Sequence, residues 1–243
     1  MLRFEDWTDP VPPASREVIT VLPDQEEHDD QPPVLFVPGL GHGARAFGEH
    51  WLGHTAGRGF PAHAVTPRPG GDLRAQVHDV VQVAASLPRQ TVLVGHGVGA
   101  LVVARALGRY PARAAVLVAP VLDGWAALGA ALRSNPFGTL PAFFGGRLRL
   151  NEKQAGEHAG RIDVRPRAEL LSRKPLPEPV GRPPTLVVGS PDDRVVRRTA
   201  LDRAAARYGG APLLFPGMGH NLMLESGWAE PIDAILDWLA KEL

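Results

Sequence analysis

Side chains that can move protons stand directly after two short apolar runs in the second half of the chain. Asp192 and Asp193 follow the run at 185–188, and His220 follows the run at 212–215. A histidine imidazole that is held by a carboxylate is an oriented general base near neutral pH. The pattern therefore predicts acid–base chemistry at the ends of two successive strands.

Two glycine-rich turns follow apolar runs in the first half of the chain. Residues 38–43, which include Leu40, follow the run at 34–37, and residues 95–99 follow the run at 91–94. Ligands of open α/β sheets bind beyond the carboxyl ends of the strands. Because all four turns are expected at those ends, we place the candidate site there.

The elements that must position these turns alternate between strands and helices. Runs of apolar residues predict strands, and apolar residues at helical spacing predict helices. The predicted strands are 18–22, 34–37, 62–66, 91–94, 114–119, 185–188 and 212–215. A helical pattern with Phe47, Trp51 and Leu52 on one side follows the turn at 38–43. The other predicted helices are 72–87, 100–110, 196–208 and 230–243, the last with Ile232, Ile235, Leu236 and Leu239 on one face. This alternation predicts an α/β protein with a mostly parallel sheet.

Residues from about 120 to 184 interrupt the alternation. The segment is rich in proline and arginine and contains the aromatic residues Trp125, Phe137, Phe143 and Phe144. We interpret residues 121–182 as a lid inserted into a core that consists of residues 1–120 and 183–243. Trp125, Phe143 and Phe144 are candidates for the apolar wall of a substrate pocket.

The order and spacing of the turns resemble those of the α/β-hydrolase fold family over nearly the whole chain. The resemblance is carried by VLVGHGVGAL at 92–101, GSPDDRVV at 189–196 and FPGMGH at 215–220. In that family a nucleophile in a G-x-S-x-G strand–turn–helix is followed along the chain by an acid and then by a histidine. The resemblance implies a mostly parallel central sheet with helices on both faces and a lid insertion.

The same resemblance implies roles for individual residues. His220 matches the family histidine, and Asp192, three residues after Gly189, matches the acid better than Asp193 does. Asp123, which follows the run at 114–119, is an outside candidate for the acid. The backbone amides that match the oxyanion hole are those of Leu40 and Val98.

Gly97 occupies the position of the nucleophile, where the family pattern has a serine. The six serines of the chain, at 15, 86, 134, 172, 190 and 226, all lie outside such a turn, and the chain has no cysteine. Glycine has no side chain that could attack a carbonyl, so the acyl-enzyme route is closed. The turn itself is expected to form, because glycine adopts a positive φ at the least cost.

We therefore predict an α/β-hydrolase-fold enzyme that works without a nucleophile, a metal or any other cofactor. His220 would move a proton, Asp192 would orient it, and the Leu40 and Val98 amides would hold an oxyanion. The expected substrate is a small apolar carbonyl or phenol compound, and by analogy the reaction belongs to secondary metabolism. Cyclisation, elimination, isomerisation and water-mediated hydrolysis are all compatible with these residues. The alternatives are a serine hydrolase inactivated by Gly97 and a non-catalytic ligand-binding pseudoenzyme.

Other histidines and an arginine near these turns are weaker candidates for substrate binding or metal ligation. His42 and Arg45 lie on the loop that carries Leu40, where they could line the pocket mouth, and Arg45 could hold a carboxylate or phenolate. His96 precedes Gly97 and would either face the pocket or pack beneath the turn. His50 and His54 have the i, i+4 spacing of metal ligands, but no third ligand is evident, so no metal site is predicted.

A dinucleotide-binding protein is the alternative from another functional class. Residues 39–44 and 95–100 both fit the pattern G-x-G-x-x-A after a strand and before a helix. For the first copy, Thr66 and Arg68 stand where an acid would hold the ribose, and Arg68 would suit NADP. This fingerprint explains neither Asp192 nor His220, so we expect no nicotinamide cofactor.

Composition limits the possible partners. Hydrophobic residues make up 44% and charged residues 21% of the chain, as in ordinary globular proteins. Lysine and arginine number 26, as do aspartate and glutamate, so overall charge attracts neither nucleic acid nor an anionic membrane. We see no signal peptide and no run long enough to span a bilayer. A cytoplasmic protein with a small-molecule substrate is expected.

Overall fold

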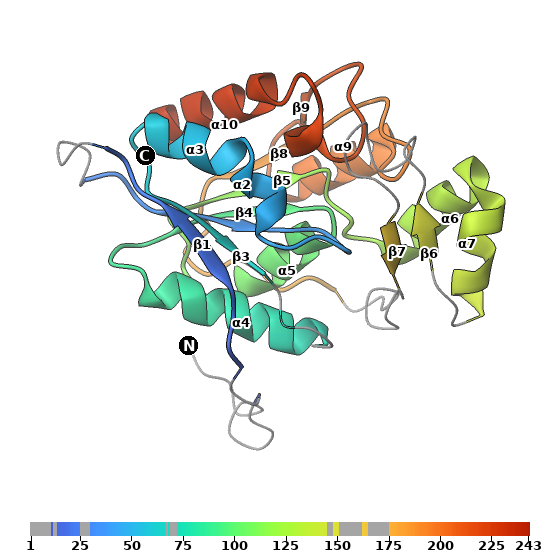
Figure 1. Cartoon of the computed structure of the whole chain (residues 1–243), viewed down its shortest axis with the longest axis horizontal. Helices are drawn as coiled ribbons and strands as arrows, with labels where there is room; N and C mark the ends of the chain where they lie inside the picture. Colours follow the sequence, from blue (N-terminus) through green and yellow to red (C-terminus); the bar gives the residue numbers. More distant parts are fainter. Residues whose placement is uncertain are drawn as a thin grey trace.

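Seven strands form one sheet at the centre of the protein, in the order β1-β3-β2-β4-β5-β8-β9 (Figure 1). The structure is a computed structural model, and it describes residues 11, 14–24, 30–66, 68, 72–144, 148–150, 162–164 and 175–243. The strands are β1 (Val18–Val21), β2 (Val34–Val37), β3 (Ala62–Val65), β4 (Val92–His96), β5 (Ala114–Val118), β8 (Thr185–Gly189) and β9 (Leu213–Leu214). β1 pairs antiparallel with β3, and every other pair in this sheet is parallel. The α/β prediction is confirmed.

Helices cover both faces of this sheet, as the resemblance implied (Figure 1). One apolar core joins the sheet to α4 (Leu73–Ser86), α5 (Val98–Ala106) and α9 (Arg198–Arg207). The other core joins it to α2 (Arg45–Gly48), α3 (Trp51–Gly57), the 3₁₀ helix Leu222–Leu224 and α10 (Ala229–Glu242). The central strands β2, β4 and β5 are buried along their whole length, because they are covered on both sides.

Local sequence signals explain where the helices begin and which face they bury. Asp72 caps α4, and its side chain accepts a hydrogen bond from the Ala75 amide at 2.6 Å. Along α10, the predicted apolar face is confirmed: Ile232, Ile235, Leu236 and Leu239 are all buried. Each such side chain contributes about 1.5–3 kcal/mol by its burial.

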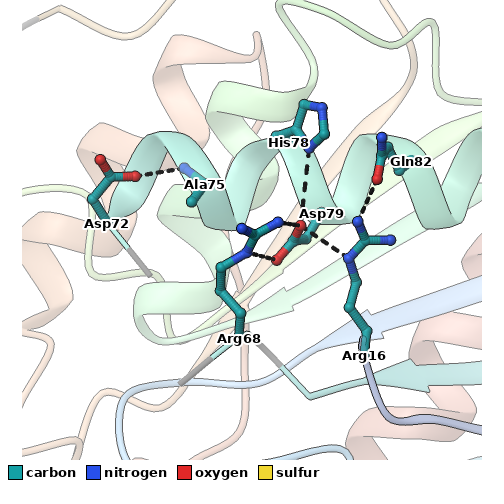
Figure 2. Close-up of polar contacts among 7 residues, drawn as sticks. All are labelled: Arg16, Arg68, Asp72, Ala75, His78, Asp79 and Gln82. Carbon is teal, nitrogen blue, oxygen red and sulfur yellow. Dashed lines mark hydrogen bonds and ion pairs between the residues drawn. The ribbon is translucent and has the colours of Figure 1, made fainter. Parts of the chain in front are cut away.

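A buried ion cluster attaches two loop segments to α4 (Figure 2). The Asp79 carboxylate, which is 1% exposed, accepts hydrogen bonds from both Nε and Nη2 of Arg68, and the Arg16 Nε lies 2.9 Å from its Oδ1. The Nη2 of Arg16 also donates to the Gln82 side chain. Burial alone would raise the pKa of Asp79, but the hydrogen bond from Arg68 and the charge of Arg16 outweigh it and lower the pKa below its usual range.

The same cluster shows what Arg68, the residue considered as a ligand of NADP, binds in the folded protein. Its guanidinium is engaged by the Asp79 carboxylate, which raises the pKa of Arg68 through the hydrogen bond and charge of that partner. The side chain therefore ties the segment after β3 to α4 and is already neutralised by a buried carboxylate. This arrangement argues against Arg68 as the anchor of a cofactor phosphate.

The segment between β5 and β8 forms its own small elements, on the right of Figure 1. They are α6 (Gly124–Ser134), α7 (Pro136–Phe143) and the antiparallel pair of β6 (Leu148–Leu150) and β7 (Ile162–Val164). The sequence pattern predicted an insertion here but none of these elements. Phe144 is 84% exposed and so is not part of a closed pocket wall, while Trp125 is 44% exposed. The Phe143 side chain lies outside the described part of the structure.

Candidate active site

The turn at Gly97 joins the end of β4 to the start of α5. Gly97 has φ +55° and ψ −117°, a left-handed conformation that favours glycine. Its amide donates to the Val118 carbonyl at 2.9 Å, and its carbonyl accepts from the Val121 amide at 2.9 Å. The expected sharp strand–turn–helix is therefore present, and it is held between β5 and the segment that follows β5.

The glycines that flank this turn are required by close backbone packing. A Cβ atom placed on Gly95 would lie 2.6 Å from the Gly99 carbonyl oxygen, and one on Gly99 would lie 2.2 Å from the Val37 carbonyl oxygen. Both distances are far inside van der Waals contact. The two glycines thus let α5 approach β2 and β4 closely, which sets the position of Gly97 between them.

Position 97 itself faces the imidazole of His220. A Cβ atom on Gly97 would lie 3.2 Å from His220 Nε2 and 3.6 Å from the Cα atom of Gly39. The imidazole would have to give way by only a few tenths of an ångström to admit a side chain there. The turn therefore points toward the histidine in the direction that a nucleophile side chain would take.

His220 is held from behind by a buried carboxylate. Its Nδ1 lies 2.8 Å from Oδ2 of Asp193, and both side chains are buried. Because a carboxylate oxygen accepts, Nδ1 carries the proton in the neutral imidazole, which leaves the lone pair of Nε2 facing Gly97. The other Asp193 oxygen accepts from the amides of Val195 at 2.6 Å and Val196 at 3.0 Å, so the carboxylate is fixed at both ends.

The acid that pairs with His220 is Asp193, and the prediction of Asp192 is wrong. Asp192 is exposed, and its Oδ2 accepts from the Gly217 amide at 2.7 Å, which braces the turn before the histidine. Asp193 is fixed by the amides of Val195 and Val196, which are themselves buried, whereas Asp192 points outward. Asp123, the outside candidate, is exposed and its Oδ1 accepts from the Ala126 amide at 3.0 Å near the start of α6.

The amides of Leu40 and Val98 flank the same position. Leu40 lies in the turn after β2, next to Gly39, whose Cα atom stands close to position 97. Val98 is the first residue of α5. Within the part of the chain that the structure describes, neither amide donates a hydrogen bond. Their role as donors to a ligand oxygen stays a prediction.

His96 packs beneath the turn, which was one of its two predicted placements. It is 1% exposed, and its Nε2 donates to the His220 carbonyl at 3.0 Å, with the two ring centroids 4.9 Å apart. Burial and the neighbouring charges of His220 and His42 hold the pKa of His96 well below its usual range. The side chain is therefore a neutral support for the turn that carries His220.

His42 and Arg45, on the loop that carries Leu40, are placed differently. The ring of His42 lies 6.3 Å from that of His96, and burial, with the charge of His220, lowers the pKa of His42. Arg45 is an exposed side chain, 3.8 Å from Glu17. The charged end of Arg45 is thus solvated beside Glu17, and its role at a pocket mouth stays a prediction.

The two histidines with metal-like spacing have other partners. His50 stacks on Trp228 with ring centroids 4.5 Å apart, and His54 Nε2 lies 2.7 Å from Asp233 Oδ1. Among the described residues, no group of three or more histidine, aspartate or glutamate side chains is placed to hold a metal ion. In the same part of the chain, every helix is too short or too polar to cross a lipid bilayer.

Comparisons with known proteins agree with this architecture. Residues 34–238 match the sequence model of the alpha/beta hydrolase family. The monoacylglycerol lipase of Paleococcus ferrophilus has a similar structure, with 16% identity, a TM-score of 0.67 and coverage of 95% of this chain and 100% of that one. A soluble variant of the monoglyceride lipase of Saccharomyces cerevisiae is 11% identical, with a TM-score of 0.70 and coverage of 93% and 92%. An esterase from Rhodococcus sp. is 18% identical, with a TM-score of 0.65 and coverage of 93% and 95%. A comparison with curated protein sequences gave no match.

Proposed function

Because the chain belongs to the alpha/beta hydrolase family, we propose that it is an enzyme of that family that performs acid–base catalysis without a nucleophile side chain. The observation that carries the proposal is the orientation of His220. Its Nδ1 bonds to Asp193 at 2.8 Å, and its Nε2 faces the side-chain position of Gly97 at 3.2 Å. The space that a serine hydroxymethyl group would fill is available to a substrate atom or to a water molecule.

In this mechanism His220 Nε2 takes a proton from the substrate or from a water bound above Gly97. Asp193 stabilises the imidazolium that results, and its bonds to the Val195 and Val196 amides keep it in place. The Leu40 and Val98 amides donate to the oxyanion that develops as the proton leaves. Returning the proton to a different atom of the substrate completes an isomerisation or a cyclisation, and giving it to the departing group completes an elimination. In a hydrolysis the water that His220 deprotonates adds to the carbonyl, and the imidazolium gives its proton to the leaving group as the bond to that group breaks.

The substrate class follows from the groups that surround this point. An oxyanion site beside a single general base suits a small, largely apolar carbonyl or phenol compound. The similar folds of two monoglyceride lipases and an esterase make esters the first compounds to test.

We also propose that residues 121–182 serve as the lid over this site, because α6 and α7 follow β5 directly, next to the Val121 amide that binds Gly97.

The test is turnover of a panel of small aryl esters, lactones and phenols by the natural protein and by His220→Ala. We expect the substitution to lower the rate by about 10²–10⁴-fold, the usual contribution of an oriented general base. His54→Ala is the matched control, because it also removes a histidine bonded to a carboxylate, Asp233. Equal rates for His220→Ala and the parent on a converted compound would contradict the proposal. If no compound is converted while several bind equally to both proteins, a ligand-binding role is the better account.

A further inference from the structure

A cavity lies between α9 and the segment that joins β5 to α6. Its volume is about 240 Å³. Its described lining comes from the segment between β5 and α6 and the start of α6, from Leu176, and from α9 and the turn before it.

The cavity has an apolar floor and a cationic rim. Val121, Val195 and Ala204 are buried and form part of the floor. Among the described lining residues, the charged ones are three arginines, Arg197, Arg203 and Arg207, and one acid, Asp123, which together carry a formal charge of +2. This excess of positive charge contrasts with the net charge of +0 of the whole chain.

The three rim arginines differ in how many hydrogen bonds and ion pairs their side chains make with other described residues. Arg207 donates to the Leu176 and Pro177 carbonyls and lies 3.5 Å from Glu178, so it supports the chain before β8. Among the described residues, the Arg203 side chain donates only from Nε, to the Thr199 carbonyl of its own helix. The Arg197 side chain makes no hydrogen bond or ion pair with any residue that the structure describes; its backbone carbonyl accepts from the Ala200 and Leu201 amides at the start of α9.

From this distribution of charge and apolar surface we propose that the cavity binds a small carboxylate with an apolar chain. The apolar chain of the ligand packs against the buried valines and Ala204 of the floor. Its carboxylate accepts hydrogen bonds from Arg197 and Arg203, whose guanidinium groups can bind it in a bidentate manner. An anion is favoured over a cation because the one acid of the lining, Asp123, already accepts from the Ala126 amide. The proposal goes beyond the function proposed above and does not depend on the chemistry at Gly97.

Three valines that line this cavity also form backbone hydrogen bonds with residues of the candidate active site. The Val121 amide donates to the Gly97 carbonyl, and the Val195 and Val196 amides donate to the Asp193 carboxylate. The methyl groups of these three valines are therefore the natural reporters of a ligand in the cavity. They distinguish it from a ligand that binds at Gly97 through His220, which does not line the cavity.

The experiment is calorimetric titration with octanoate, with octan-1-ol as the uncharged probe, combined with methyl NMR spectra of the valines. We expect octanoate to bind with a Kd on the order of 1 mM or tighter, as a ligand of this size allows. It should shift the Val121, Val195 and Val196 methyl signals. Arg197→Gln/Arg203→Gln should weaken octanoate by about five- to tenfold, the effect of two exposed arginine–carboxylate contacts.

Three controls complete the experiment. Arg198→Gln removes an exposed arginine of the same helix that pairs with Asp202 and does not line the cavity, so octanoate affinity should not change. His220→Ala should also leave octanoate affinity unchanged, which separates this proposal from the one about catalysis. Octan-1-ol should bind the parent and the double variant equally. The proposal is overturned if octanoate does not bind, if it binds the double variant as tightly as the parent, or if the three valine signals stay in place.

Discussion

Replacing Asp193 by asparagine should reverse the protonation of the His220 ring. The Asp193 oxygen that accepts from the Val195 and Val196 amides must remain an oxygen, so the new NH₂ group of Asp193→Asn points at His220 Nδ1. Nδ1 must then accept, and the proton moves to Nε2, the atom that faces Gly97. His220 would no longer be a base toward position 97, and a rate that depends on it should fall by about 10²–10⁴-fold.

The matched control is Asp192→Asn, which makes the same chemical change one residue earlier. Asp192 is exposed and its side chain braces the Gly217 amide, a bond that an asparagine oxygen can replace. Its effect on the rate should be less than about fivefold. Long-range ¹H–¹⁵N spectra of the His220 ring report the tautomer directly. They should show Nδ1–H in the parent and in Asp192→Asn, and Nε2–H in Asp193→Asn. A change of tautomer in Asp192→Asn alone would refute the assignment of Asp193 as the partner.

Two further predictions concern stability. Gly99→Ala places a Cβ atom 2.2 Å from the Val37 carbonyl oxygen, so we expect a loss of about 3 kcal/mol or more in the free energy of unfolding, measured in urea. Asp79→Asn leaves the Arg16 and Arg68 charges without their buried partner and should cost about 3–5 kcal/mol. Because the folded-state pKa of Asp79 is lowered, its stabilisation is fully present above the unfolded pKa of about 3.9. It is lost as the pH falls through the folded pKa, so thermal unfolding of the parent should show this acid loss and Asp79→Asn should not.

The sequence predicted the parts of the fold that depend on local pattern. The strand at Val34–Val37 and the apolar face of α10 were read from hydrophobic periodicity alone, because burial on one or both faces decides which residues can occupy those positions. The strained turn at Gly97 was expected from the resemblance to the α/β-hydrolase fold family and from the low cost of a positive φ for glycine.

Features that depend on residues far apart in the chain could not be predicted in the same way. Asp192 and Asp193 are adjacent, and the choice between them depends on how the turn after β8 meets the His220 loop, 27 residues later. Arg45 and Arg68 looked alike as candidate ligands of an anion, yet one is solvated and the other is bound to Asp79. Only the packed structure separates these cases.

The most direct test of the account is to restore a nucleophile at the turn. Gly97→Ser should react with a fluorophosphonate at position 97, because the new side chain meets His220 Nε2 and the Asp193 pair is in place. Intact-mass spectrometry should show one adduct on Gly97→Ser and none on the parent or on Gly97→Ser/His220→Ala. An adduct on the folded Gly97→Ser protein that forms equally fast without His220 would contradict the central claim, as would a folded Gly97→Ser protein that never reacts.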